Sequence, residues 1–210
     1  MAIESQGTKI EIGTGIGAAV SAVTAAVGYP TIITKASHGL NDGDVVTLSD
    51  FAGEDAALLN GKTVVIKNVT ENTLAFDIDT TGKTLTAANG TLTPVEWTAI
   101  GEVTDFSGPD GTATEIDTTH LLSDAKEYLM GLPDEGNFTL SINWEPTDVG
   151  QATAIAARKA RAEKNFKVTY SDDSTATFKG YILGLSSSGA VDGKIDGSIT
   201  IRITDEVIWA

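Results

Sequence analysis

The stretch "NFTLSINWE", residues 137–145, alternates apolar and polar side chains along its whole length. Successive side chains of a β-strand point to opposite faces, so this alternation places the apolar residues on one face and the polar residues on the other. We therefore predict a strand with one face on a core and the other face polar. The apolar positions are Phe138, Leu140, Ile142 and Trp144.

Strand-like runs continue on both sides of this segment. Residues 101–117 favour two strands around the turn sequence Gly-Pro-Asp-Gly at 108–111, which would form an acidic hairpin. Residues 119–136 lack such regularity and are predicted to be a long irregular connection. Two or three further strands are predicted between residue 165 and the end of the chain.

One helix is predicted, at residues 148–164. Asp148 is a plausible N-cap, and Gln151 follows it at the spacing of a capping box. A narrow apolar stripe on this helix is expected to lie flat against the sheet. The fold class is therefore mainly β with one α-helix. The stripe consists of Val149, Ala152, Ile155, Ala156 and Ala160.

Residues 29–93 have a different sequence pattern from the rest of the chain. They contain four strand-like runs separated by turn sequences, and their only aromatic residues in a core-forming pattern are Phe51 and Phe76. Pro30 and Pro94 stiffen the two junctions. We predict a small all-β domain at 29–93, inserted into a discontinuous core domain made of residues 1–28 and 94–210.

The composition restricts the possible partners. The chain has 210 residues, no cysteine and a formal net charge of −15. Without cysteine there are no disulfides and no thiolate metal sites. An acidic chain repels phosphate and does not bind nucleic acid by releasing counterions.

No constellation of residues predicts catalysis. "GTGIG" at 13–17 has the wrong spacing for a dinucleotide-binding loop, and a flexible arm explains its glycines. Asp117, His120 and Ser123 are the residue types of a hydrolase triad, but they fall across one strand end, and a histidine at a corner of the chain is the simpler interpretation. The two histidines lie in different segments, which argues against zinc. The sequence predicts neither an enzyme nor a bound cofactor or metal.

No targeting signal is visible in the sequence. The apolar segment 16–28 is short for a membrane span, and it lacks a preceding basic region. We expect no membrane association and assembly in the host cytoplasm.

A family resemblance rests on several motifs in order. "IGEVTDFSGPDGTATEIDTTHL", "KEYLMGLPDEGNFTLSINWEP", the following helix and "GAVDGKIDGSITIRITDEVIW" are together similar to the major tail tube proteins of long-tailed, non-contractile bacteriophages. The resemblance covers residues 1–15 and 95–210. Residues 29–93 depart from it and resemble small β-modules of other phage structural proteins.

The resemblance implies a virion component whose core domain is a β-sandwich or half-barrel with one flanking α-helix. Six copies would form a ring in which a β-sheet from each copy joins one shared barrel, and the rings would stack into a tube. DNA would pass through an acidic lumen during genome ejection without specific binding. The implied partners are further copies, the tape measure, the tail terminator and the distal tail protein. The inserted domain would lie on the outer surface, because six such domains and a DNA duplex do not fit in one bore.

Two groups of candidate residues follow. Acids on the predicted hairpin and on the alternating strand are expected to face the lumen: Glu102, Asp105, Glu115, Asp117 and Glu145. Apolar residues in the irregular connection are expected to contact a neighbouring subunit or ring, together with one lysine: Leu121, Leu122, Lys126, Tyr128, Leu129 and Met130.

The alternative from another class is a monomeric β-sandwich for adhesion or carbohydrate binding. Such a module would cluster aromatic residues on one exposed face. The chain has three tryptophans, and Trp97 and Trp144 fall on strand faces with other apolar residues. Rings or tubes in electron micrographs would separate the two interpretations.

Overall fold

The computed structural model describes residues 4–86 and 90–210 and divides into two compact units. Unit 1 contains the chain up to Ile12 and residues 98–209, and unit 2 contains residues 13–97. The chain passes between the units within two strands, β1 (Lys9–Ile16) and β7 (Gly90–Ala99).

Unit 1 is built on one large antiparallel sheet. Its strand order is β1, β12 (Lys164–Thr169), β13 (Thr175–Gly189), β14 (Ile195–Ile203), β11 (Asn137–Asn143) and β8 (Val103–Ser107), and β15 (Ile208–Trp209) also pairs with β13. Phe138, Leu140 and Ile142 are buried, as the alternation of β11 predicts. They share one core with Phe166, Phe178 and three isoleucines of β14, Ile199, Ile201 and Ile203.

One helix flanks this sheet, α1 (Val149–Ala160). Asp148 is its N-cap, and the side chain of Asp148 accepts a hydrogen bond from Gln151 N at 2.9 Å. The mainly β fold class with one flanking helix is thus confirmed. The chain also contains no helix, among its described residues, with the length and apolar character of a membrane span.

The predicted apolar stripe of α1 is wrong. Its Val149 is 63% exposed, and Ala152 and Ala156 are also exposed. The helix instead buries its smallest residues and one polar side chain, because only these allow it to approach the sheet closely. The buried positions are Gly150, Gln151, Ala154 and Ala157.

The hairpin predicted around residues 108–111 is also wrong. β8 pairs with β11, whereas β9 (Thr112–Asp117) pairs with β10 (Tyr128–Asp134) in a separate two-stranded sheet. The turn sequence therefore joins two sheets. The later part of the predicted irregular connection is the second strand of this ribbon, because Tyr128, Leu129 and Met130 are matched in register with residues of β9.

Unit 2 is a closed antiparallel sheet. Its strand order is β6 (Thr73–Phe76), β3 (Thr31–Thr34), β2 (Val20–Ala26), β7, β4 (Val45–Ser49) and β5 (Thr63–Val65). Lys67, just after β5, bridges to Ala75 in β6 and closes the sheet. A short 3₁₀ helix, η1 (Ala56–Leu58), lies between β4 and β5. Phe51 and Phe76 are buried among aliphatic side chains in its core.

Candidate assembly surfaces

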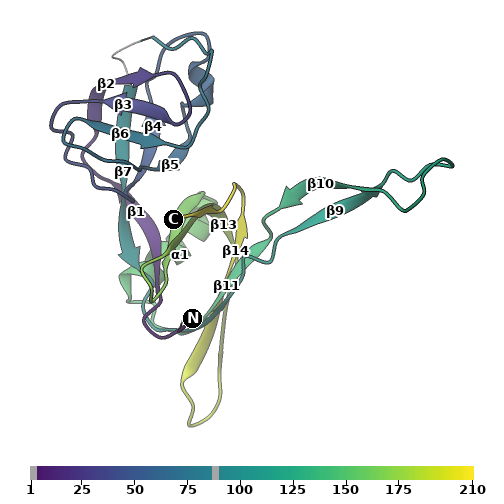
Figure 1. Cartoon of the computed structure of the whole chain (residues 1–210). Coiled ribbons are helices and arrows are strands. Elements are labelled where there is room, and N and C mark those ends of the chain that lie inside the picture. The colour runs from purple at the N-terminus through teal and green to yellow at the C-terminus, as the bar shows by residue number, and fades with distance from the viewer. Residues whose placement is uncertain (1–3, 87–89) are drawn as a thin grey trace. The chain divides into compact units, whose positions relative to one another are not determined.

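The most exposed part of unit 1 is a two-stranded ribbon, residues 108–136, which we call the arm. Figure 1 shows β9 and β10 running away from the rest of unit 1 and ending in a loop. Ile116 pairs with Leu129 on one side of the arm, and Glu115 pairs with Met130 on the other. The arm is strongly acidic, with seven acids and one base.

The base of the arm is fixed to the sheet by hydrogen bonds and an ion pair. Arg202 of β14 donates to both carboxylate oxygens of Asp134, at 2.7 and 2.6 Å. These hydrogen bonds from Arg202 lower the pKa of Asp134, and a hydrogen bond from the backbone N–H of Gly136 lowers it further. On the other strand, the side chain of Asp110 accepts from Asn137 N. Gly136 has a φ of +70°, and a Cβ there would lie 2.2 Å from Asp110 Oδ1, so this junction requires glycine.

The tip of the arm, residues 118–127, has an ordered turn. His120 Nδ1 accepts from Leu122 N at 3.1 Å, and Ser123 Oγ accepts from His120 N at 3.1 Å. Glu127 O accepts from Thr118 N at 2.9 Å. Asp117 accepts from Thr119, and these hydrogen bonds lower the pKa of Asp117. The residues that resemble a triad therefore build a turn, and within the described residues no group of metal-ligating side chains forms a metal site.

The arm exposes apolar side chains on both faces and at its tip. Leu121 is 105% exposed, Leu122 89% and Leu132 92%. Tyr128, Leu129 and Met130 are also exposed, while Lys126 lies in the tip. An isolated two-stranded ribbon is marginally stable in water, because it has no core of its own. Contiguous exposed apolar residues of this kind mark a contact with another protein.

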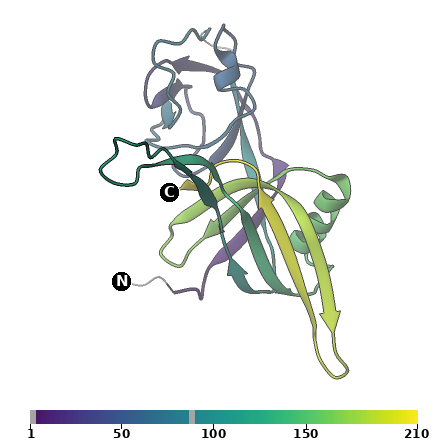
Figure 2. The same cartoon turned by 90° about the vertical axis from the view of Figure 1, so that its right-hand side faces the viewer.

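The second surface is the polar side of the main sheet, which we call the hydroxyl face. It is the side of β8, β11, β14 and β13 opposite the apolar core, and cross-strand pairing aligns its residues in rows. One row is Asp105, Ser141, Ser198 and Ser186, and the next is Ser107, Thr139, Thr200 and Gly184. Figure 2 shows the β13–β14 hairpin, which extends this surface beyond the other strands. The remaining members are Asn137, Asn143, Tyr181, Ser188, Asp196 and Arg202.

The hydroxyl face is close to electrically neutral. Its Arg202 is paired with Asp134, and its Asp196 is paired with Lys194 at 2.9 Å. Within the described chain, Asp105 is the one carboxylate of this face without an ion pair. The face thus offers mainly hydroxyl and amide groups. The alternation of residues 137–145 predicts the part of the hydroxyl face that lies on β11. The matching residues of β13 and β14 can be identified only from the register of the strand pairing.

The five candidate lumen acids lie on different elements. Asp105 is on the hydroxyl face, and Glu115 and Asp117 are on the arm. Glu102 lies in the turn before β8, where its carboxylate accepts from Asn143 Nδ2 at 2.7 Å. Glu145 follows β11, and its carboxylate accepts from Thr147 N at 3.3 Å. The structure therefore does not bring these five acids together in one cluster.

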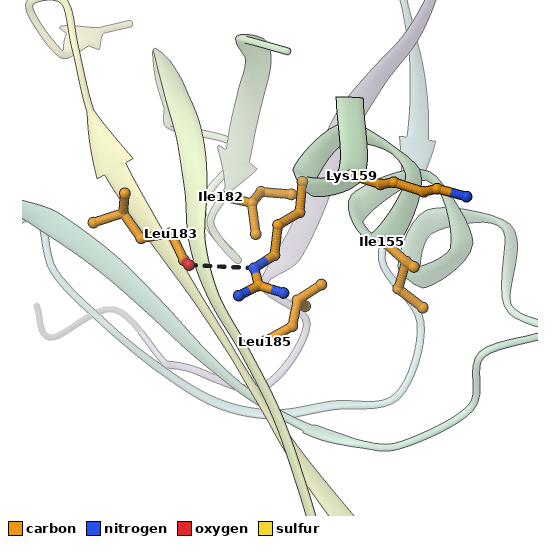
Figure 3. Close-up of a pocket in the computed structure, with 6 residues that line it drawn as sticks. Ile155, Lys159, Ile182, Leu183 and Leu185 are labelled. Carbon is orange, nitrogen blue, oxygen red and sulfur yellow. Dashed lines mark hydrogen bonds between the residues drawn. The ribbon is translucent and has the colours of Figure 1, made fainter. Parts of the chain in front are cut away.

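A third surface is a groove of about 460 Å³ between α1 and β13, which we call the α1–β13 groove. Figure 3 shows Ile155 and Lys159 on the helix side and Ile182 and Leu185 on the strand side. A β-bulge between Ile182 and Gly184 turns the side chain of Leu183 away from the helix. The carbonyl of Leu183 accepts from Arg158 Nε at 3.3 Å. Sequence reasoning missed this groove because it depends on the rotation of α1 and on the bulge.

Comparisons with known proteins agree with the sequence motifs. Structural protein 3 of Pseudomonas phage PAJU2 is 26% identical over 130 residues, which cover 51% of this chain and 79% of that protein. A chain of the anti-feeding prophage (AFP) baseplate matches with a TM-score of 0.45 and 8% identity, over 81% of this chain and 94% of that chain. This TM-score is too low to support an inference about assembly. The family model described as "Lambda phage tail tube protein, TTP" matches residues 78–210. The chain belongs to the lambda phage tail tube protein family, a family of structural components of the phage tail.

Proposed function

We propose that this protein is the repeating subunit of a hollow phage tail tube, in which rings of six copies stack and conduct DNA. The observation that carries the proposal is the arm, which exposes apolar residues that its own chain does not cover. Because the chain belongs to a family of tail components, we expect another copy in the tail to cover these apolar residues. The tube is a structural element of the virion and performs no catalysis.

The edge of the main sheet supports ring closure. Within the described chain, β8 pairs with β11 alone, so its outer edge presents unpaired backbone groups. Exposed strand edges are prone to uncontrolled pairing, and closing the sheets of several copies into one barrel removes them. In this arrangement β8 meets the sheet of the next copy.

The hydroxyl face lines the lumen in this proposal. The opposite side of the sheet is occupied by the core and by α1. A surface made mainly of hydroxyls and amides releases few counterions from DNA and does not retain it. Asp105 adds repulsion within the bore, and Glu102, which accepts a hydrogen bond from Asn143 of the same face, adds negative charge beside it. Glu115 and Asp117 lie on the arm, which we assign to a contact between copies. The segment 29–93 lies on the outside of the tube, where its eight acids and four bases are solvated.

Electron microscopy of the purified full-length chain tests this function. We expect rings or tubes with a central bore, whereas compact monomers at high concentration would favour the monomeric binding module. A double variant, Glu102→Lys with Asp105→Lys, should still assemble but should acquire salt-sensitive DNA affinity. Its matched control is Asp172→Lys with Asp173→Lys, a reversal of two exposed acids in the β12–β13 turn. Normal genome delivery by tubes of the first variant would contradict the lumen assignment.

A further inference from the structure

The arm tip and the α1–β13 groove have complementary chemistry. We propose that the arm tip of one copy docks in the α1–β13 groove of a second copy, with Leu121 and Leu122 against its apolar walls. Asp124 and Glu127 of the tip then lie near Arg158 and Lys159. This inference rests on the proposed function, because it specifies the surface that receives the arm.

The groove is apolar inside and cationic at its rim. Ile155, Ile182 and Leu185 provide the apolar walls. Arg158 makes its hydrogen bond through Nε, and within the described chain neither Arg158 nor Lys159 belongs to an ion pair. Pockets of about 300–1,000 Å³ enclose small organic ligands, so a groove of about 460 Å³ has room for leucine side chains.

The arm tip is the matching partner. The N–H groups of His120, Leu122 and Glu127 are hydrogen-bonded within the turn, so the tip is partly ordered before its leucines become buried. Leu121 and Leu122 are almost fully exposed and adjacent. Asp124 and Glu127 outnumber Lys126, so the tip is acidic and the groove is basic. Opposite charges at the rim fix the orientation of apolar contacts at the centre.

The geometry favours a second copy over the same chain. β9 and β10 lead away from the sheet that carries the groove (Figure 1). From Gly108 to Leu121 an extended strand spans about 40 Å, which is enough to reach a neighbouring subunit. Cations near a helix C-terminus also offset the helix dipole, but the dipole does not account for the apolar walls beside them.

Disulfide trapping between two single-cysteine proteins tests the contact, since the natural chain has no cysteine. Leu122→Cys protein is mixed with Ile155→Cys protein before assembly, oxidised, and analysed on a non-reducing gel. We expect a covalent dimer. Adding Lys159→Glu to the Ile155→Cys protein should reduce the dimer yield, and adding Glu127→Lys to the Leu122→Cys protein should then restore it.

Val149→Cys is the matched control, because Val149 is an exposed residue of the same helix that does not line the groove. Leu122→Cys with Val149→Cys, and each variant alone, should give little dimer. Tubes that form without a 122–155 disulfide, or with an equally strong 122–149 disulfide, overturn this docking and leave the proposed function standing. Absence of tubes from the natural chain overturns the proposed function, and the docking with it.

Discussion

Arg202 ties the arm to the main sheet by an ion pair with Asp134. Arg202→Gln removes the two charge-assisted hydrogen bonds to Asp134, so the arm base should open more often. We expect faster amide exchange in residues 110–113 and 131–136, with the core residues of β11 unchanged. The control is Arg161→Gln, an exposed arginine at the C-terminus of α1. Equal exchange in both variants would show that the glycine-rich junction alone holds the arm.

Glu11 makes the stability of unit 1 depend on pH. It is 5% exposed and pairs with Lys9 at 2.6 Å and Lys167 at 3.1 Å. Burial by itself raises the pKa of Glu11, but the two lysines outweigh this effect and hold the pKa below the ordinary value of a glutamate. A lowered folded-state pKa means that Glu11 stabilises unit 1 above its unfolded pKa, and that this contribution is lost as the pH falls through the folded value.

Glu11→Gln should therefore reduce the free energy of unfolding at pH 7 by about 1–2 kcal/mol. The difference from the natural chain should shrink below about pH 4, where the unfolded carboxyl is protonated. Urea unfolding followed by tryptophan fluorescence at both pH values measures it. Glu4→Gln makes the same change at an exposed site and should have no effect at either pH. A difference that stays constant with pH would mean that Glu11 acts through packing and not through its charge.

At the scale of the element, two buried residues, Gly150 and Gln151, fix the position of α1 against its neighbours. A Cβ on Gly150 would lie 2.3 Å from Ala99 O and 2.6 Å from Ile100 Cα. The buried Gln151 side chain donates to Gly101 O at 3.1 Å and to Asn143 O at 3.0 Å, and it accepts from Glu145 N at 2.9 Å. Gln151 thus joins the helix to the ends of β7 and β11, in place of the predicted reciprocal capping bond.

Gly150→Ala should destabilise unit 1 by about 1–3 kcal/mol, because the methyl group overlaps backbone that cannot move aside. The direction of the change in stability is informative, because alanine is intrinsically favoured over glycine in a helix by about 1 kcal/mol. Thermal unfolding by circular dichroism measures the effect. Val149→Ala, one residue away with an exposed side chain, is the control. A Gly150→Ala variant that is more stable than the natural chain would contradict the close packing of α1 against the backbone of Ala99 and Ile100.

At the scale of the whole molecule, the two units can be separated by deletion. Gly17 N donates to Pro94 O at 2.7 Å, so the chain enters and leaves the closed sheet of unit 2 at adjacent points. Domain removal is tolerated where entry and exit lie close together. Replacing residues 18–93 with a short Gly/Ser linker should leave a folded unit 1 that still forms rings with an unchanged bore. Electron microscopy of the deletion tests this, and a folded variant that forms no rings would make unit 2 an assembly element.

The sequence by itself determined the mainly β fold, the apolar face of β11, the single helix with its Asp148 N-cap, and the family. These features depend on local periodicity, on capping chemistry and on motifs that are continuous in the chain. Tertiary structure alone decided the partners of β8 and β9, because strand pairing depends on residues distant in sequence, and here the turn at 108–111 leads into a second sheet. It also decided the face that α1 buries, since close approach to the sheet selected Gly150, Ala154 and Ala157 over the more apolar Val149. The groove beside that helix follows from the same rotation, and no local pattern specifies it.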